Sequence, residues 1–307
     1  MSAALPLPPS GWIILDKPHG LGSTQAVAAV KRNLRQAGFG KGVKVGHGGT
    51  LDPLATGVLP IALGEATKLC GKMLDASKTY EFTVRFGVET DTLDLEGKVI
   101  AESPVRPGRG AVEAALARFT GPIEQVPPAY SALMVDGQRA YDLARAGETV
   151  ELKSRAVTIY ALDLAAADED SATLVARVSK GTYIRSLARD IARALGTCGH
   201  VTHLRRTKAG PFGIEQAISL DKLNEVGKGA PLENVLLPLE AGLVDIPALD
   251  LGPEQARAVR QGRVLAGLPF DDGLYWARAG TVPVALVELS GGSLTVSRGF
   301  NLTMIAE

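Results

Sequence analysis

The length, composition and charge of the chain exclude several classes of protein. It has 307 residues, of which 46% are hydrophobic and 21% are charged, as is typical of a folded globular protein rather than a disordered one. No apolar run approaches the roughly 20 residues that a membrane span requires, and the first residues carry no signal-peptide pattern. Two cysteines, Cys70 and Cys198, are too few for a disulfide framework, so we expect a cytoplasmic protein.

The formal net charge is zero, but the charged residues are unevenly distributed along the chain. Residues 177–210 contain eight Lys or Arg and one acid, a net charge of +7. Residues 1–51 contain six Lys or Arg and one acid, a net charge of +5, whereas residues 211–307 carry a net charge of −5. Such a distribution suits an anionic partner, although a solvated surface explains the charge alone equally well.

The first 75 residues predict a short strand, two helices and a glycine-rich loop. Residues 11–15 form an apolar strand that ends where Asp16-Lys17-Pro18 interrupts the ladder of hydrogen bonds. Ser23 or Thr24 can cap the helix that follows. The glycine-rich and basic residues 38–49 are expected to form a loop. An apolar run and a second helix are then expected at 58–63 and 65–75.

Two patterns in the rest of the chain are especially regular. Apolar and polar residues alternate from 80 to 88, which predicts a half-buried strand. After Gly181, apolar residues at helical spacing predict a helix that ends before Gly196, with Arg185, Arg189 and Arg193 on the opposite face. Other helices are expected at 111–119, 140–146 and 253–261, and strands at 157–164 and 174–179.

The order of these elements indicates the fold class. Strands and helices do not alternate regularly, so we expect an α+β fold with a mixed or antiparallel sheet rather than a doubly wound one. Glycine- and valine-rich strands from residue 249 onwards predict a small β-rich terminal domain of about 60 residues.

Several familiar catalytic motifs do not occur in the sequence. There is no Gly-Lys-Ser/Thr at the spacing of a phosphate-binding loop and no Gly-x-Ser-x-Gly elbow of a serine hydrolase. The sequence also contains no His-x-Glu and no Cys-x-x-Cys, which excludes a zinc deaminase. We therefore expect chemistry that uses no metal.

Asp52 is an acid in unusual surroundings. Pro53 disfavours helical backbone at Asp52, and Gly48, Gly49 and Gly57 permit backbone shapes that other residues resist. An acid held this rigidly after a basic loop could serve as a nucleophile or as a turn residue. The local sequence by itself favours the turn.

Five segments carry motifs in a recognisable order. They are Asp16-Lys17-Pro18, Val45-Gly46-His47-Gly48-Gly49-Thr50-Leu51-Asp52-Pro53-Leu54-Ala55-Thr56-Gly57-Val58-Leu59, Lys78-Thr79-Tyr80, Pro127-Pro128-Ala129-Tyr130-Ser131-Ala132, and Gly181-Thr182-Tyr183-Ile184-Arg185-Ser186-Leu187. Together these segments resemble the TruB family of tRNA pseudouridine-55 synthases, over about residues 11–223. The family often has Thr at Gly22 and Gly48, loop positions where we expect little effect, and Lys at Met134.

The resemblance implies a catalytic group. Asp52 matches the acid that attacks a uridine flipped out of its stack, and Arg185 matches an arginine that pairs with this acid. Asp94 matches an acid that shares the arginine, although a surface loop would also explain Asp94. Tyr80 matches a ring that stacks on the flipped uracil, although a core aromatic would suit the same strand.

The resemblance also implies groups that bind the substrate. His47 would occupy the gap that the flipped nucleotide leaves, and Lys17 would brace the loop or a phosphate. Tyr183 and Leu204 would line the uracil pocket, although helix packing would explain both side chains without a function.

The resemblance further implies the domains, the partners and the activity. A pseudouridine synthase domain with a mixed, mainly antiparallel sheet is expected at 1–246, with an insertion at about 127–153, followed at 247–307 by an RNA-binding domain of the PUA type. We expect a monomer that acts on uridine 55 in the T-arm of tRNA, without a cofactor, a metal, a membrane or an obligatory protein partner. The alternatives are a synthase that acts on another RNA and a non-catalytic RNA-binding or tRNA-folding chaperone.

Overall fold

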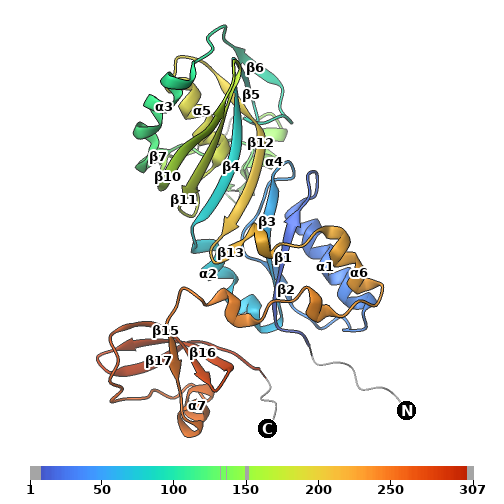
Figure 1. Cartoon of the computed structure of the whole chain (residues 1–307), viewed down its shortest axis with the longest axis vertical. Coiled ribbons are helices and arrows are strands. Elements are labelled where there is room, and N and C mark those ends of the chain that lie inside the picture. Colours follow the sequence, from blue (N-terminus) through green and yellow to red (C-terminus); the bar gives the residue numbers. More distant parts are fainter. Residues whose placement is uncertain (1–7, 132, 136, 149–151, 303–307) are drawn as a thin grey trace. The chain divides into compact units, whose positions relative to one another are not determined.

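The computed structural model describes residues 8–131, 133–135, 137–148 and 152–302, and Figure 1 shows the course of the chain. The chain divides into two compact units. Unit 1 comprises Met1–Pro53, Val58–Leu74 and Gly210–Glu307, and unit 2 comprises Leu54–Gly57 and Asp75–Ala209. Within the described ranges, no helix is both long and apolar enough to cross a membrane. The division into domains at 246/247 stays a prediction.

A sheet in the order β12-β4-β11-β10-β7 forms the centre of unit 2. Every neighbouring pair in this row is antiparallel, whereas the first residues of β3, Thr56 and Gly57, pair in parallel with Arg205 and Arg206 of β12. The expected mixed, mainly antiparallel sheet is therefore confirmed. The strands are β3 (Thr56–Leu63), β4 (Lys78–Phe86), β7 (Gly121–Gln125), β10 (Arg155–Ala167), β11 (Ser171–Val178) and β12 (Gly199–Ala209).

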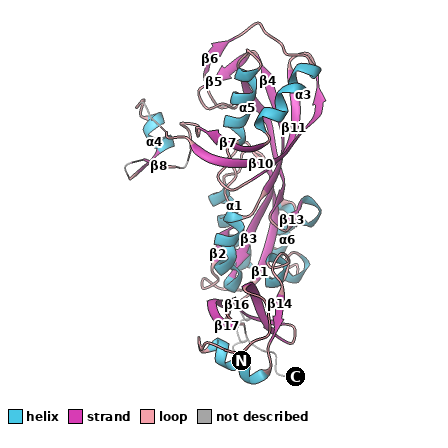
Figure 2. Cartoon of the chain, turned by 90° about the vertical axis from the view of Figure 1, so that its left-hand side faces the viewer, coloured by secondary structure: helices cyan, strands magenta, loops and turns pink. Residues whose placement is uncertain are grey.

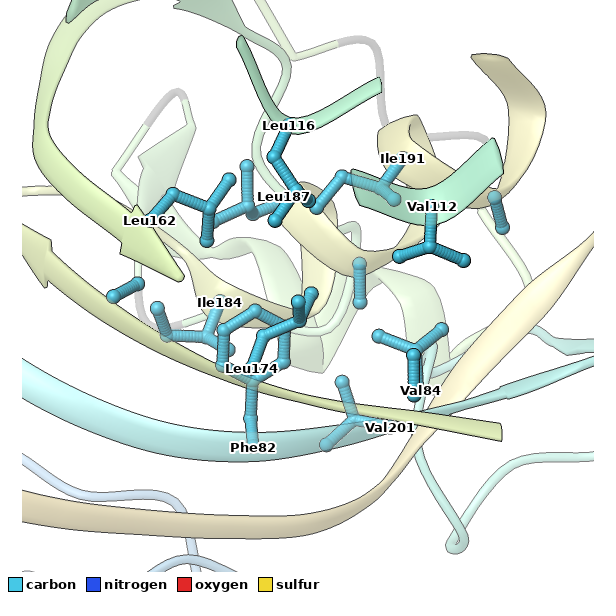
Figure 3. Packing of buried hydrophobic residues seen from close by; sticks show 14 of the residues in the cluster. Phe82, Val84, Val112, Leu116, Leu162, Leu174, Ile184, Leu187, Ile191 and Val201 are labelled. Carbon is cyan, nitrogen blue, oxygen red and sulfur yellow. The ribbon is translucent and has the colours of Figure 1, made fainter. Parts of the chain in front are cut away.

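Two helices pack on this sheet and close the core of unit 2. They are α3 (Arg109–Leu116), which continues into a 3₁₀ turn at Ala117–Phe119, and α5 (Ile184–Ala194). Figure 3 shows side chains of α3 and α5 meeting those of the sheet. The alternating pattern predicted this arrangement, because side chains two residues apart on a strand share one face. The labelled members of the core are Phe82, Val84, Val112, Leu116, Leu162, Leu174, Ile184, Leu187, Ile191 and Val201.

The predicted strand 80–88 is interrupted at Gly87. This glycine has a φ of +91°, and a β-carbon there would overlap the guanidinium of Arg106. The chain therefore leaves β4 and forms a separate hairpin of β5 (Val88–Thr90) and β6 (Val99–Glu102).

The described residues of the expected insertion at 127–153 form little regular structure. Its described part holds the short hairpin β8 (Met134–Val135) and β9 (Gln138–Arg139) and the helix α4 (Ala140–Arg145). Figure 2 shows β8 and α4 standing away from the sheet of unit 2. Residues 132, 136 and 149–151 lie outside the described part, and Met134 is exposed.

Unit 1 begins with β1 (Gly11–Lys17) and α1 (Ser23–Gln36), close to the expected strand and helix. The residue before α1, Gly22, caps the helix, and its N–H donates to the side chain of Gln25 at 2.8 Å. The prediction that Ser23 or Thr24 caps α1 is therefore wrong. The helix expected at 65–75 is a 3₁₀ helix (Gly64–Leu69) followed by α2 (Cys70–Asp75).

The expectation of a loop throughout 38–49 is also wrong. Val45–His47 form β2, which pairs antiparallel with Ile61–Leu63 of β3. A second helix, α6 (Leu220–Gly227), packs beside α1 and was not predicted. Its capping residue Ser219 accepts a hydrogen bond from the N–H of Lys222 at 3.1 Å, a signal that the sequence does contain. Shorter elements are β13 (Phe212–Gly213) and 3₁₀ turns at Ile214–Gln216, Leu232–Asn234 and Leu239–Gly242.

The C-terminal residues are rich in β-structure, as predicted. A four-stranded sheet has the order β14-β15-β16-β17, and α7 packs against it with a small core that includes Val259, Ala277 and Val287. The helix expected at 253–261 corresponds to α7. The elements are β14 (Ala248–Asp250), α7 (Pro253–Arg260), β15 (Gly273–Ala279), β16 (Val282–Ser290) and β17 (Ser293–Gly299).

Candidate active site

The backbone on both sides of Asp52 is held by hydrogen bonds within unit 1. The hydroxyl of Ser23 accepts from the N–H of Leu51 at 2.8 Å and donates to its carbonyl at 2.9 Å. On the other side, the carbonyl of Pro53 accepts from the N–H of Gly20 at 2.8 Å. The peptides that flank the half-buried Asp52 are thus tied to the start of α1 and to the turn that precedes it.

Lys17 stabilises the same loop through hydrogen bonds from its buried side chain. Its side chain is fully buried, and its Nζ donates to the carbonyls of Pro18, Leu21 and Pro53 at 3.0, 2.6 and 3.2 Å. A buried ammonium group needs such bonds to offset the loss of water. Lys17 therefore links the end of β1 to the residue that follows Asp52.

His47 is the last residue of β2, five residues before Asp52. It pairs with Ile61 of β3, and its Nδ1 accepts from the N–H of Gly49 at 3.3 Å. The next residue, Gly48, donates its N–H to the carbonyl of Pro60 at 2.8 Å. The strand pairing therefore fixes the backbone at His47, which a solvated loop would leave free.

In unit 2, Arg185 and Asp94 form a buried ion pair. Both residues are only 6% exposed, and Nη1 of Arg185 lies 3.4 Å from Oδ2 of Asp94. The guanidinium also donates to the carbonyls of Thr92 at 2.8 Å and Tyr130 at 3.0 Å. The surface-loop alternative for Asp94 is therefore wrong.

The turn that carries Asp94 has an unusual backbone. Leu93 has a φ of +64°, a conformation that costs a non-glycine residue on the order of 1–2 kcal/mol. Bonds on both sides hold it there, because the N–H of Val201 donates to the carbonyl of Leu93 at 2.9 Å. The carboxylate of Asp94 accepts from the hydroxyl of Thr92 at 2.5 Å and from the N–H of Glu96 at 3.0 Å. The strained turn thus presents an oriented carboxylate to Arg185.

Tyr183 immediately precedes α5 and is fixed from two directions. Its N–H donates to Oε1 of the fully buried Gln125 at 2.8 Å, and Nε2 of Gln125 donates to its carbonyl at 3.1 Å. The guanidinium of Arg155 stacks on its ring, 4.6 Å from the centroid, and also donates to the carbonyl of Gly181. The backbone and the ring are therefore both held, two residues before Arg185.

Tyr80 and Leu204 lie on adjacent strands of the same sheet. Tyr80 of β4 pairs with Arg206, and Leu204 of β12 pairs with Phe82. Both side chains are partly buried against the core of unit 2. Core packing therefore accounts for part of both side chains, and their contact with a uracil stays a prediction.

Two buried cations accompany Tyr80. Lys78 begins β4 and donates to the carbonyl of Ala76 at 2.7 Å, and Arg206 on the neighbouring strand is 1% exposed. Burial, and after it the charge of Arg206, lower the pKa of Lys78 to about 8. The sheet thus holds positive charge beside the expected base-stacking residue.

The three arginines of α5 differ in their surroundings. Arg185 is buried, whereas the side chain of Arg189 is 13% exposed and that of Arg193 is 58% exposed. Arg189 pairs with Asp190 and donates to the carbonyl of Val126, and Arg193 pairs with the buried Glu89 at 2.7 Å. Of these three arginines, only Arg193 has the exposed side chain that a purely solvated helix face would give.

The structure thus assembles the predicted residues into two groups. Lys17, His47 and Asp52 belong to unit 1, and Tyr80, Asp94, Tyr183, Arg185 and Leu204 belong to unit 2. Sequence analysis missed Ser23, Gln125 and Arg155, which hold the predicted residues in place. The consecutive prolines Pro127-Pro128 indicate that a strand ends near Gln125, but they do not indicate that its amide bonds Tyr183.

Comparisons with known proteins identify the family of the chain. Residues 32–184 match the family model of the TruB family pseudouridylate synthase (N terminal domain), and residues 185–244 match that of the tRNA pseudouridylate synthase B C-terminal domain. The chain is 77% identical over 302 residues to a tRNA pseudouridine synthase B of Novosphingobium aromaticivorans, with 97% of this chain and 99% of the relative covered. The corresponding protein of Zymomonas mobilis subsp. mobilis is 59% identical, with 95% and 96% covered.

Solved structures show the same fold. A Cbf5-Nop10-Gar1 complex contains a chain that superposes with a TM-score of 0.73 at 26% identity, covering 94% of this chain and 84% of that one. An H/ACA RNP bound to a substrate RNA containing 2'-deoxyuridine gives a TM-score of 0.71, also at 26% identity, with 94% and 84% covered. Together with the family models and the identities above, these matches establish that the chain belongs to the TruB family of pseudouridylate synthases.

Proposed function

We propose that this chain isomerises uridine to pseudouridine at position 55, in the T-loop of tRNA, and that Asp52 is the group that attacks. The relatives described above are named tRNA pseudouridine synthase B, which supports the substrate. The observation that carries the proposal is the fixed loop around Asp52. Hydrogen bonds from Ser23, Gly20 and Lys17 hold the neighbouring peptides. A carboxylate that attacks a substrate has to point in one direction, and a fixed backbone provides this orientation.

The chemistry explains why a carboxylate is required. The bond between N1 of uracil and C1′ of ribose breaks, the uracil turns, and C5 of the base bonds to C1′. A proton leaves C5 and a proton is added at N1, so that the product is an isomer of the substrate. Glycosidases also break a bond at an anomeric carbon with the help of a carboxylate. Here the ionised Asp52 can add to C1′, add to the base, or remove the C2′ proton.

The substrate base has to leave its stack before the reaction. Extrusion of a nucleotide costs a few kcal/mol, which contacts with the flipped base and the RNA backbone have to offset. In this proposal Tyr80, Tyr183 and Leu204 contact the uracil, and His47 occupies the gap in the RNA. The pairing of Arg185 with Asp52 stays a prediction.

We also propose that the protein acts on tRNA without a protein partner. In this proposal the described part of the expected insertion, from β8 to α4, adds an RNA contact; it stands away from the sheet of unit 2 (Figure 2). The β-rich C-terminal residues would add a PUA-like RNA contact.

The test compares the wild-type protein with Asp52→Asn on an unmodified T-arm minihelix. We expect the wild-type protein to form pseudouridine, and the variant to form none while its Kd for tRNA stays unchanged. Turnover by the variant at the wild-type rate would contradict the role of Asp52. Turnover by the wild-type protein on another RNA but not on the minihelix would contradict the substrate. If the wild-type protein binds tRNA but modifies no RNA, a non-catalytic chaperone is supported instead.

A further inference from the structure

A cavity lies between α1 and the chain that leads from α1 into β2, within unit 1. Its volume is about 270 Å³. We call it the α1 pocket. It is lined by Lys31, Leu34, Arg35, Gly40, Lys41, Val43 and Val45.

The charged residues of the α1 pocket are all basic. Lys31, Arg35 and Lys41 are exposed, and no acidic residue contributes to the lining. Among the described residues, none of the three forms an ion pair. Basic side chains elsewhere in the chain do form ion pairs with carboxylates, as Arg193 does with Glu89 at 2.7 Å. Three like charges around one cavity without a counter-charge favour an anionic ligand.

Arg32, the neighbour of Lys31, lies outside the pocket. Its Nη2 donates to Oδ1 of Asn224 in α6 at 3.2 Å, and Asn33 donates to the same oxygen at 3.0 Å. Successive helical residues project about 100° apart, so adjacent cations on α1 serve different surfaces. Arg32 is therefore a matched reference for Lys31, with the same charge on the same helix.

The rest of the lining is apolar and well anchored. Leu34 is buried, and Val43 and Val45 are half-buried. The turn after α1 is closed by a bond from the N–H of Phe39 to the carbonyl of Leu34 at 3.1 Å, and Val45 pairs with Leu63 of β3. An apolar surface beside three cations suits the sugar or base of a nucleotide whose phosphate contacts the cations.

The α1 pocket is close to the loop of Asp52 along β2. Val45 lines the pocket, and His47 ends the same strand two residues later. A strand rises about 3.3 Å per residue, so these two residues are about 7 Å apart. Because each strand of a DNA duplex carries a phosphate about every 3.4 Å of helix axis, and neighbouring phosphates of an RNA are similarly close, an RNA at His47 has further phosphates within reach of the pocket.

We propose that the α1 pocket binds the sugar–phosphate backbone of the substrate RNA near the target uridine, through Lys31, Arg35 and Lys41. The identity of the ligand rests on the proposed function. Phosphate contacts position an RNA without reading its sequence. The pocket thus contributes to the affinity for the RNA and to its position, and takes no part in the chemical step.

The experiment measures tRNA binding as a function of KCl concentration. Each lost phosphate contact reduces the slope of log K against log [KCl] by about 0.7–0.9. We expect this reduction for Lys31→Ala and no reduction for Arg32→Ala. The combined variant Lys31→Ala, Arg35→Ala, Lys41→Ala should lose about 2–3 from the slope, with a raised KM and an unchanged kcat at saturating tRNA.

Further variants separate the charge from the fold and the RNA from a free anion. Lys31→Arg and Lys41→Arg retain the charge and should retain the slope, and urea unfolding checks that the alanine variants fold. Equal slopes for Lys31→Ala and Arg32→Ala would overturn the proposal. The proposal would also be overturned if inorganic phosphate binds the pocket tightly and the combined variant shows the same salt dependence of tRNA binding as the wild-type protein. Because the slopes need no turnover, they decide the proposal even if the wild-type protein forms no pseudouridine.

Discussion

Gly48 and Met73 approach each other so closely that a side chain at Gly48 would require one of the two residues to shift. A β-carbon at Gly48 would lie 2.6 Å from Cβ of Met73 and 3.1 Å from its Cγ. Met73 belongs to α2 and is 2% exposed, so it has little room to move. A Thr at this position, as the family often has, would require Gly48 or Met73 to shift. The expectation that the departure from Thr has little effect on the activity stays a prediction.

We expect Gly48→Ala to lower the free energy of unfolding by about 1–3 kcal/mol, the usual cost of overpacking. Met73→Ala should leave this cost in place, since alanine retains the β-carbon, whereas Met73→Gly should reduce it. Gly46→Ala is the control, because its β-carbon would lie at an ordinary 3.4 Å from Sγ of Cys70. Urea denaturation of the single and double variants measures these differences. Equal costs for Gly46→Ala and Gly48→Ala would contradict the packing argument.

A second prediction concerns Gln125, whose amide bonds both backbone groups of Tyr183. Gln125→Met keeps the volume but removes both bonds, so we expect a loss of about 1–3 kcal/mol in the free energy of unfolding. Gln125→Glu keeps an acceptor for the N–H but places a charge against the carbonyl, and should not restore stability. The exposed Gln138 provides the control, since Gln138→Met should change stability by less than about 0.5 kcal/mol. A stable Gln125→Met protein would show that these bonds contribute little.

The pair of Arg185 and Asp94 leads to a prediction about both stability and turnover. Removal of one member of a buried pair leaves an uncompensated charge, so Asp94→Asn should cost about 3–5 kcal/mol. We expect Arg185→Met to reduce kcat at saturating tRNA by about 100-fold, the cost of a displaced reacting group. Arg193→Met removes an exposed guanidinium from the same helix and should leave kcat unchanged. An unchanged kcat for Arg185→Met would remove Arg185 from the catalytic group.

The buried Lys78 predicts a dependence of stability on pH. Its pKa is about 8 in the folded protein against 10.5 for an ordinary lysine, mainly because burial disfavours the charged form. Between these values the unfolded chain binds more protons, so the free energy of unfolding rises with pH from 8 to 10.5. Below pH 8 the lysine is charged in both states, and the full penalty of about 3 kcal/mol remains.

Comparison of the wild-type protein with Lys78→Met isolates this contribution. Methionine does not titrate, so the stability of the wild-type protein relative to the variant should increase as the pH rises from 8 to 10.5. Urea denaturation at a series of pH values provides the measurement. Parallel pH profiles for the two proteins would show that Lys78 titrates normally.

Periodicity predicted the elements that bury one continuous face. Phe82, Val84 and Phe86 alternate in β4, and Leu187 and Ile191 follow helical spacing in α5, so the sequence contains the same pattern as the core. β12 escaped prediction because it carries Arg205, Arg206 and Lys208. A strand with a fully buried arginine such as Arg206 depends on charges and hydrogen bonds from distant parts of the chain, which spacing does not reveal.

The residues of the candidate site also fall into those that the sequence identified and those that it did not. The motifs identified Asp52 and Arg185, and the family resemblance implied Asp94; the chemistry of all three belongs to the residues themselves. The motifs did not identify Ser23 or Gln125, because each acts on the backbone of a residue more than 25 positions away. No local pattern records which carbonyl a hydroxyl or an amide will meet after folding. Supporting residues of this kind therefore become visible only in three dimensions.

The clamp on Leu51 and Pro53 has a consequence for substrate choice. Because both peptides beside Asp52 are tied down, the acid cannot follow a nucleotide that sits out of place, and the RNA has to supply the movement. Unstacking is cheapest where a base is already unpaired or poorly stacked. The stiffness of this short loop thus acts as a filter that selects RNAs by how readily they deform.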